Sequence, residues 1–206
     1  ASRSSKKIGH LIFKNIISNG FKGEVFPVNP KAEKILNHPA YSSINDIPAA
    51  VDLAIIVIPA PAVAPVLEQV AQKGVKAAII ISAGFGESDA SGQKREKEIK
   101  KISQKYPLRI LGPNCLGIIN PYHQLNASWG GSDFPKEGGL VFFSQSGALS
   151  VPVLEFCQKN NLGLNCFISL GNKVDINETD ILEFFGKEKR AQILAGYLES
   201  FKNGRN

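Results

Sequence analysis

At 206 residues the chain can form one large domain or two small ones, and either can bury a hydrophobic core. Its composition, 43% hydrophobic and 20% charged, is ordinary for a soluble globular protein. The net charge of +6 is compatible with an anionic ligand, but the basic residues are scattered and form no basic face with aromatic side chains, which excludes a nucleic-acid partner.

The composition also bears on the cellular compartment. No apolar run reaches the length of a membrane span and no signal peptide is present, so we expect no membrane partner. The three cysteines, Cys115, Cys157 and Cys166, have neither a metal-binding nor a redox spacing. Their odd number is typical of a reducing compartment, and we predict a cytoplasmic protein.

The first half of the chain alternates strands and helices. Apolar residues at helical spacing begin at Ile8, and Asn19-Gly20 is a stop signal for that helix. The strands expected at residues 52–58 and 77–81 are continuous apolar runs, as in a parallel sheet buried on both faces. This alternation predicts right-handed crossovers and a doubly wound sheet. The expected strands are residues 24–28, 52–58, 77–81 and 109–111, and the further helices are residues 63–73 and 91–105.

The alternation is interrupted between Asn120 and Gly139, where two prolines and a glycine pair occur. We therefore predict a first domain of residues 1–121, an interdomain linker of residues 122–138 and a second domain of residues 139–206. The second domain stops without a closing helix, and the chain has no methionine and opens on Ala1, so we expect a fragment. The expected strands of this domain are residues 140–143, 164–169 and 192–198, with helices at 148–159 and 178–185.

Small residues and prolines follow the strands of the first domain. Ligands of an open parallel sheet bind beyond the carboxyl ends of its strands, and small residues let a nucleotide approach the backbone there. Arg3 and Lys31 carry the cations that pair well with phosphates. Each turn alone is ordinary loop chemistry, but together they predict a nucleotide-type site. The turns are Ala1-Ser2-Arg3, Asn29-Pro30-Lys31, Pro59-Ala60-Pro61-Ala62, Ser82-Ala83-Gly84 and Pro113-Asn114-Cys115.

A second kind of site is expected at Ser144-Gln145-Ser146-Gly147, between an apolar strand and a helix. The first turn of a helix presents unpaired amides and the positive end of the dipole, which suits an anion. Ser146 also fits a plain helix cap, and the two roles are compatible. A serine-hydrolase elbow is disfavoured, because Phe143 stands where the first glycine of that motif belongs.

Other polar residues are weaker candidates. Asp175 opens a segment that imitates a calcium loop, but Asp180 and Gly186 occupy the positions that need glycine and glutamate, so we predict no metal site. Cys115 has no base placed to activate it and is interpreted as a wall residue of the site. The three histidines, His10, His38 and His123, lie in no catalytic motif and are interpreted as structural or solvated.

Several of these motifs occur in the order of one known family. The segments Val28-Asn29-Pro30-Lys31, Ile81-Ser82-Ala83-Gly84-Phe85, 111–117 and 143–149 resemble the CoA-binding part of the NDP-forming acyl-CoA synthetases, relatives of the succinyl-CoA ligase α subunit. The resemblance covers nearly the whole chain. It implies an α/β fold: a Rossmann-like CoA-binding domain followed by a partial flavodoxin-like ligase domain, both with doubly wound parallel sheets. The family's first strand would precede Ala1, so we expect it to be missing.

The resemblance also implies roles for single residues. Glu199 would hold a catalytic histidine, Asn114 would belong to the same catalytic set, and the histidine itself would lie in a later segment of the family. The implied phosphate-binding residues are Ser144, Ser146, Gly147, Gly171 and Asn172. The implied CoA-binding residues are Ser2, Arg3, Asn29, Pro30, Lys31, Pro59, Ala60, Ser82 and Gly84.

The implied reaction interconverts acyl-CoA, ADP or GDP, and phosphate with the free acid, CoA, and ATP or GTP, through an acyl phosphate and a phosphohistidine. The implied cofactors are coenzyme A and ADP/ATP or GDP/GTP with Mg, the nucleotide being bound by a segment absent from this chain. The implied partners are an ATP-grasp β subunit or fused domain and a small carboxylic acid substrate, in an oligomer. The fragment alone is expected to be inactive.

Two alternatives remain open. One is a synthetase-like, acyl-CoA-sensing module of a protein lysine acetyltransferase. The other is an NAD(P)-binding module, which the sheet order alone would favour. That module needs an acidic residue after the second strand to hold the ribose, whereas Asn29-Pro30-Lys31 offers a basic one.

Overall fold

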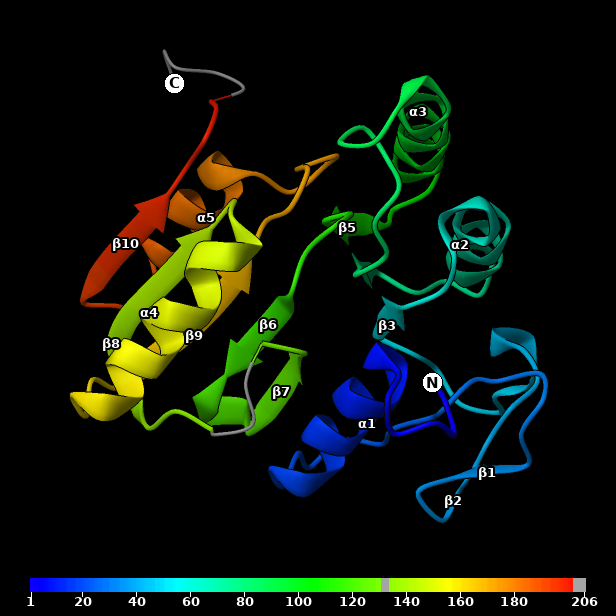
Figure 1. The fold of residues 1–206 in the computed structure, drawn as a ribbon, viewed down its shortest axis with the longest axis horizontal. Helices are drawn as coiled ribbons and strands as arrows, with labels where there is room; N and C mark the ends of the chain where they lie inside the picture. Colours follow the sequence, from blue (N-terminus) through cyan, green and yellow to red (C-terminus); the bar gives the residue numbers. More distant parts are fainter. Residues whose placement is uncertain (131–133, 202–206) are drawn as a thin grey trace.

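The computed structural model describes residues 1–130 and 134–201, which form two α/β halves joined side by side (Figure 1). The α/β class with parallel sheets, predicted from the sequence, is confirmed. Residues 131–133 of the predicted linker and residues 202–206 of the predicted second domain lie outside the described residues.

The first half is built on a parallel three-stranded sheet of order β3-β4-β5. Alternate residues of β4 point to opposite faces, as the pleat requires. Ala78 and Ile80 pack with helices α2 and α3, whereas Ile79 packs with α1, as does Ile81 directly after the strand. The elements are α1 (Ile8–Ser18), β1 (Lys34–Ile35), β2 (His38–Pro39), β3 (Leu53–Ile56), α2 (Val63–Gln72), β4 (Ala77–Ile80), α3 (Ala90–Lys105) and β5 (Arg109–Leu111).

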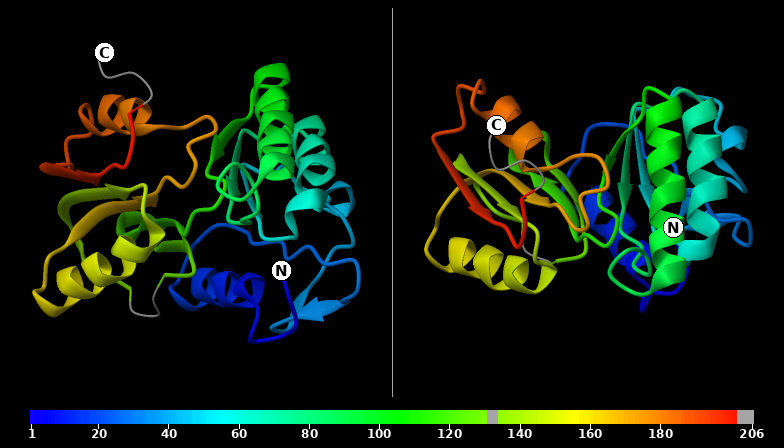
Figure 2. Two further views of the ribbon diagram at one scale, coloured as in Figure 1. Left: turned by 45° about the horizontal axis from the view of Figure 1, so that its top comes forward. Right: turned by 90° about the horizontal axis from the view of Figure 1, so that it is seen from above.

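The second half is a five-stranded sheet of order β10-β8-β9-β6-β7. Strands β10, β8 and β9 are parallel, and β6 and β7 extend the sheet as an antiparallel pair. Helices α4 and α5 cover opposite faces of this sheet (Figure 2). The elements are β6 (Gly117–Asn120), β7 (Leu125–Ser128), β8 (Glu137–Ser144), α4 (Gly147–Lys159), β9 (Leu164–Ser169), α5 (Glu178–Phe185) and β10 (Ile193–Tyr197).

Two sequence predictions differ from the structure. The segment predicted as a linker contains β7, and β6, which lies inside the predicted first domain, pairs with β9 of the second sheet. The strand predicted at residues 24–28 is reduced to a single bridge between Val28 and Tyr41. Pro27 explains this in part, because it has no N–H to donate to a ladder.

The two halves are joined by backbone hydrogen bonds. Residues 172–176, which follow β9, run beside residues 110–113 of the first half: the amides of Asn172, Val174 and Ile176 donate to the carbonyl oxygens of Pro113, Gly112 and Ile110 at 2.9–3.0 Å. An exposed ion-pair group reinforces this seam, since Arg109 pairs with Asp175 at 3.0 Å and with Asp180 at 2.8 Å. The seam fixes how the loops of the two halves face each other.

Within residues 1–130 and 134–201, no helix is both long and apolar enough to cross a membrane. In the same residues, no cluster of three or more His, Cys, Asp or Glu side chains is arranged to hold a metal ion.

Candidate functional site

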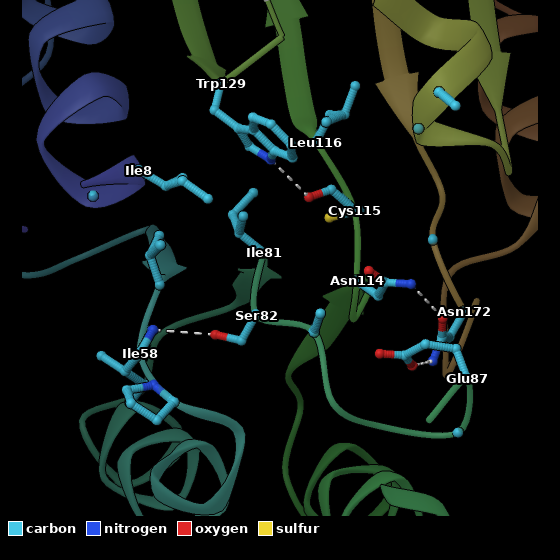
Figure 3. Close-up of a pocket in the computed structure, with 18 of the residues that line it drawn as sticks. Ile8, Ile58, Ile81, Ser82, Glu87, Asn114, Cys115, Leu116, Trp129 and Asn172 are labelled. Carbon is cyan, nitrogen blue, oxygen red and sulfur yellow. Dashed lines mark hydrogen bonds between the residues drawn. The ribbon is translucent and has the colours of Figure 1, made fainter. Parts of the chain in front are cut away.

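A cleft of about 1380 Å³ lies where the strand-end loops of the first half meet the start of α4 (Figure 3). Its walls come from both halves, so the seam between residues 110–113 and 172–176 determines its shape. The lining residues are Ala1, Ser2, Lys6, Lys7, Ile8, Gly9, Val57, Ile58, Pro59, Ile81, Ser82, Ala83, Gly86, Glu87, Gln93, Glu96, Asn114, Cys115, Leu116, Trp129, Gln145, Ser146, Gly147, Ala148, Gly171, Asn172 and Glu199.

One part of the cleft is apolar. Ile8, Ile81 and Leu116 surround it, and the indole of Trp129 closes one side (Figure 3). The Trp129 Nε1 donates a hydrogen bond to the Cys115 carbonyl oxygen at 3.4 Å, which orients the ring. Trp129 is 38% exposed, so part of its ring is available to a ligand.

The opposite part is polar and centres on Asn172. Its Nδ2 donates to Glu87 Oε2 and, at 2.7 Å, to Glu96 Oε2, while its Oδ1 accepts from Asn114 Nδ2 at 3.4 Å. Partial burial raises the pKa of Glu87, but the hydrogen bonds from Asn172 and from the amides of Gly84 and Phe85 outweigh it, and the net pKa is lowered. The Glu87 carboxylate is therefore charged and already bonded at neutral pH.

The loops of this polar part approach each other closely. Gly171 has φ +58°, and a Cβ at this position would lie 2.1 Å from the carbonyl oxygen of Pro113. Only glycine fits such an approach without a shift of backbone. Asn114 also has a left-handed conformation, with φ 56°, which asparagine tolerates better than most residues.

The start of α4 has the features expected of an anion-binding helix terminus. Ser146 is the N-cap, and its hydroxyl accepts from the Leu149 amide at 3.3 Å. Gly147 and Ala148, at the first two positions of the helix, line the cleft. The first helical turn leaves amides without intrahelical partners, so this end of the helix can receive a negative group.

The structure brings together nine of the predicted site residues in the cleft lining: Ser2, Pro59, Ser82, Asn114, Ser146, Gly147, Gly171, Asn172 and Glu199. The other seven lie outside the lining: Arg3, Asn29, Pro30, Lys31, Ala60, Gly84 and Ser144.

Several of the residues outside the lining support it. The Asn29 Nδ2 donates to the Ala1 carbonyl oxygen at 2.9 Å. Gly84 is held on both sides, since its amide donates to Glu87 and its carbonyl accepts from Arg95 Nε. Ser144 is fully buried, and its hydroxyl bonds the backbone of Ser146, which shapes the turn into α4.

Sequence reasoning missed several residues of the lining. Lys6 and Lys7 lie between the predicted Ala1-Ser2-Arg3 turn and the predicted start of α1, so the sequence could have indicated that they lie near the site. Trp129, the single tryptophan, was hidden in the segment predicted as a linker. Glu87 and Glu96 reach Asn172 only through the packing of the two halves, which no local pattern encodes.

Cys115 lines the cleft but is 4% exposed, and burial raises the pKa of its thiol to about 12. This agrees with its interpretation as a wall residue, because a thiol with such a pKa supplies little thiolate at neutral pH. None of the three histidines lines the cleft. Of these, His10 bonds the Ser2 carbonyl oxygen through Nδ1, and His38 packs edge-on against Phe13.

Comparisons with known proteins match this arrangement. Residues 1–121 match the model of a CoA binding domain, and residues 137–206 match that of a succinyl-CoA ligase like flavodoxin domain. The alpha subunit of acetate–CoA ligase [ADP-forming] II from Pyrococcus furiosus is 41% identical across the whole chain, which covers 44% of that subunit. The acetate–CoA ligase [ADP-forming] of Methanocaldococcus jannaschii is also 41% identical, and the chain covers 28% of it.

A solved structure agrees at the level of the fold. The dinucleotide forming acetyl-coenzyme A synthetase 1 of Ca. Korarchaeum cryptofilum, in complex with phosphate and ADP, superposes with a TM-score of 0.94 at 36% identity. The match covers all of this chain and 44% of that one. The chain thus spans less than half the length of these relatives.

Proposed function

The chain belongs to the CoA-binding domain family, which its residues 1–121 match, and from this we propose that it is the CoA-binding portion of an NDP-forming acyl-CoA synthetase. The whole protein would interconvert acyl-CoA, a nucleoside diphosphate and phosphate with the free acid, CoA and the nucleoside triphosphate. The relatives favour this reading over an acyl-CoA-sensing module or an NAD(P)-binding module, since those named above are acid–CoA ligases.

One observation carries the proposal: a single cleft joins the strand-end loops of the first half to the capped start of α4 in the second. The reaction needs a thiol ester and a phosphoryl group to meet. A cleft that combines a strand-end nucleotide-type site with a helix terminus suited to an anion brings both within one cavity.

The residues of the cleft fit CoA in size and chemistry. A volume of about 1380 Å³ exceeds that of pockets for drug-sized ligands, which reach about 1,000 Å³. Lys6 and Lys7 offer cations for phosphates, and apolar residues such as Ile58 and Ile81 offer a surface for an uncharged arm. Ser2, Pro59 and Ser82 would contact CoA directly, while Arg3, Asn29, Pro30, Lys31, Ala60 and Gly84 would act at or behind the rim.

The phosphoryl group would be held at the polar end. Ser146 and Gly147 at the start of α4, with Gly171 and Asn172 from the facing loop, would surround its oxygens, and buried Ser144 would support the turn. Glu199 and Asn114 would orient the group that carries the phosphoryl. In this proposal that group is a histidine from a segment outside the chain, which receives phosphate from an acyl phosphate.

The nucleotide would be bound elsewhere in the whole protein, with Mg, on an ATP-grasp β subunit or fused domain. The relatives support this division, because they include an alpha subunit and a longer single chain. A small carboxylic acid would be released when the acyl phosphate passes its phosphoryl group to that histidine, and in the reverse direction it would be the substrate. The enzyme would work as an oligomer. The cytoplasmic location expected from the sequence stays a prediction.

Calorimetric titration of the chain with CoA, and separately with NAD⁺, tests the binding part of this proposal. We expect saturable binding of CoA and none of NAD⁺; the reverse result would favour the NAD(P)-binding alternative. A coupled assay for ATP from acetyl-CoA, ADP and phosphate tests the catalytic part. We expect turnover by the whole protein and none by residues 1–206 alone.

A further inference from the structure

The backbone at the end of β10 is held by one glutamine side chain. Gln145 Oε1 accepts hydrogen bonds from two consecutive amides, those of Glu199 at 3.0 Å and Ser200 at 3.2 Å. Its Nε2 donates to the Ser200 hydroxyl at 3.2 Å, and its own amide donates to the Tyr197 carbonyl oxygen at 2.9 Å. Both polar atoms of the Gln145 side chain are thus bonded to residues 199 and 200.

A buried lysine holds the same segment from the other side. Lys173 Nζ donates to the Ser200 carbonyl oxygen at 2.6 Å and pairs with Glu178 Oε2 at 3.0 Å. The side chains of Lys173 and Glu178 are only 2% and 6% exposed. Burying two charges is costly unless further hydrogen bonds compensate, and the bond from Lys173 to the Ser200 carbonyl oxygen is one such bond.

These two anchors act on a segment that would otherwise have little support. In the described residues, β10 is an edge strand that pairs only with β8, and Glu199 lies beyond its last paired residue, Tyr197. Glu199 is exposed, yet it lines the cleft with Ser146 and Asn172. Its direction therefore depends on how residues 199–200 are held.

The anchors also come from the two loops that supply the phosphate end of the cleft. Gln145 directly precedes Ser146, and Lys173 directly follows Asn172. The same backbone that carries the proposed phosphate-binding residues therefore fixes the position of Glu199 relative to them. If either loop shifted, its phosphate-binding residue (Ser146 or Asn172) and the anchored Glu199 would move together.

We propose that Gln145 and Lys173 are positioning residues, which clamp residues 199–200 so that the Glu199 carboxylate faces the start of α4. Only the role of Glu199, to orient the group that carries the phosphoryl, rests on the proposed function. The clamp itself is a statement about the backbone and is tested without any turnover.

Amide hydrogen exchange tests the clamp. In Gln145→Met, which keeps the side-chain length but loses both acceptor and donor, the amides of Glu199 and Ser200 should exchange at least about tenfold faster. The pair Lys173→Met with Glu178→Gln, which leaves no buried charge unpaired, should accelerate the same amides. Lys105→Met is the control: it removes an exposed ion pair with Glu68 in the first half, away from residues 172–176 and 199–200, and the exchange of the Glu199 and Ser200 amides should not change.

Phosphoenzyme formation in the whole protein tests the consequence for Glu199. Gln145→Met should slow phosphorylation by about tenfold to a hundredfold, as expected for a misplaced group, with the CoA affinity unchanged. In a Glu199→Gln background the same change should have less than about a twofold further effect, because the two residues act as one unit.

The two results separate two failures. If the amides of Glu199 and Ser200 keep their protection in Gln145→Met, or if the mutation slows phosphorylation by the same factor in both backgrounds, the clamp is wrong. If the amides lose protection but the parent protein forms no phosphoenzyme, the clamp stands as a backbone anchor and the proposed function fails.

Discussion

Asn15 of helix α1 donates a hydrogen bond from Nδ2 to the backbone carbonyl oxygen of Ser128 in β7, 2.9 Å away and 113 residues later in the chain. Both residues are buried, at 5% and 0% exposure. A helix of the first half is thus bonded to the sheet of the second, next to the apolar part of the cleft. This bond, together with the seam at residues 172–176, makes the two halves depend on each other.

We expect Asn15→Ala to lower the free energy of unfolding by about 1–3 kcal/mol, because the buried Ser128 carbonyl loses its donor. Denaturant titration followed by circular dichroism measures the change. Asn160→Ala is the matched control, since Asn160 Nδ2 donates to the Phe156 carbonyl oxygen at the same 2.9 Å but at an exposed helix end. That control should change stability by less than about 0.5 kcal/mol. Equal effects in the two variants would contradict the interpretation.

Lysines near the first-half loops should contribute to CoA binding. We expect Lys31→Ala and Lys6→Ala each to weaken binding by roughly 1–3 kcal/mol, the worth of a hydrogen bond to a charged group, and to flatten its dependence on salt. Lys6 lines the cleft, whereas Lys31 is exposed outside the lining. Calorimetric titration with CoA at two ionic strengths measures both effects.

Lys159→Ala, at the exposed far end of α4, is the control and should leave the CoA affinity unchanged. If Lys31→Ala binds CoA as tightly as the parent at low salt, the placement of the phosphates near Asn29-Pro30-Lys31 is wrong. Loss in Lys6→Ala alone would move them to the start of α1.

Two substitutions separate the capping role of Ser146 from its phosphate-binding role. Ser146→Ala removes the cap and should cost about 1 kcal/mol of stability. Ser146→Asp keeps an N-cap acceptor for the Leu149 amide but places a negative charge beside the proposed phosphate. We therefore expect Ser146→Asp to keep the stability of the parent and to lose phosphoenzyme.

Thermal unfolding gives the stability of each variant, and trapping of radiolabelled phosphate in the whole protein gives the phosphoenzyme. Ser146→Ala should retain part of the phosphoenzyme, since the backbone amides remain. Normal phosphoenzyme in Ser146→Asp would remove the start of α4 from the proposed phosphate site.

The buried thiols should make the protein less stable in alkali. Burial raises the pKa of Cys115 and of Cys166 to about 12 from an ordinary value of 9.0. The unfolded chain releases these protons above about pH 9 while the folded chain retains them, so stability falls between pH 9 and 12 by up to about 1.4 kcal/mol per pH unit for each thiol.

Denaturant titration at pH 8 and pH 10 measures this loss. The loss should be smaller when both Cys115 and Cys166 are replaced by alanine, whatever the stability of that variant at pH 8. An unchanged difference between the two pH values would show that the thiols ionise as freely in the folded chain as in the unfolded one. Slow reaction of the parent with a disulfide reagent at pH 8 is the companion expectation.

Local patterns were sufficient to predict the elements with strong periodicity. The apolar runs around Ile55 and Ile79 gave β3 and β4, and the charged helix α3 was found within one residue of its start. Helix α4 begins one residue before the predicted position, at Gly147, because Ser146 is its cap. The bounds of these elements depend mainly on their own residues, so the local sequence is sufficient to predict them.

Strands β6 and β7 were missed because their signals are unusual. The turn between them begins at Pro121 and contains Gln124 with φ 52°, where a glycine or asparagine would be the expected marker. In β7, Asn126 and Ser128 are fully buried polar residues, and the Ser128 hydroxyl donates to Asn126 Oδ1. Because buried strands are usually apolar, the sequence of β7 has the pattern of a polar loop. The burial of these two residues follows from contact with α1, far away in sequence.

The site divides in the same way. Residues at strand ends, such as Ser82 and Asn114, were predictable because topology alone brings strand ends to one edge. Contacts such as Asn172 with Glu87, and Lys173 with Ser200, depend on how two separately folded loops meet. No periodicity carries that information.

The hairpin of β6 and β7 has a consequence for how this molecule can be divided. The family matches end at residue 121 and resume at residue 137, so β7 belongs to neither, and β6 is matched with the first domain although it pairs in the second sheet. A break after residue 121 would separate the two strands of the hairpin. A break between residues 112 and 117 would pass through Asn114 and Cys115 in the wall of the cleft. We therefore expect the two domains to occur together in one chain in related proteins. Gene fusions and fissions should fall outside residues 112–137.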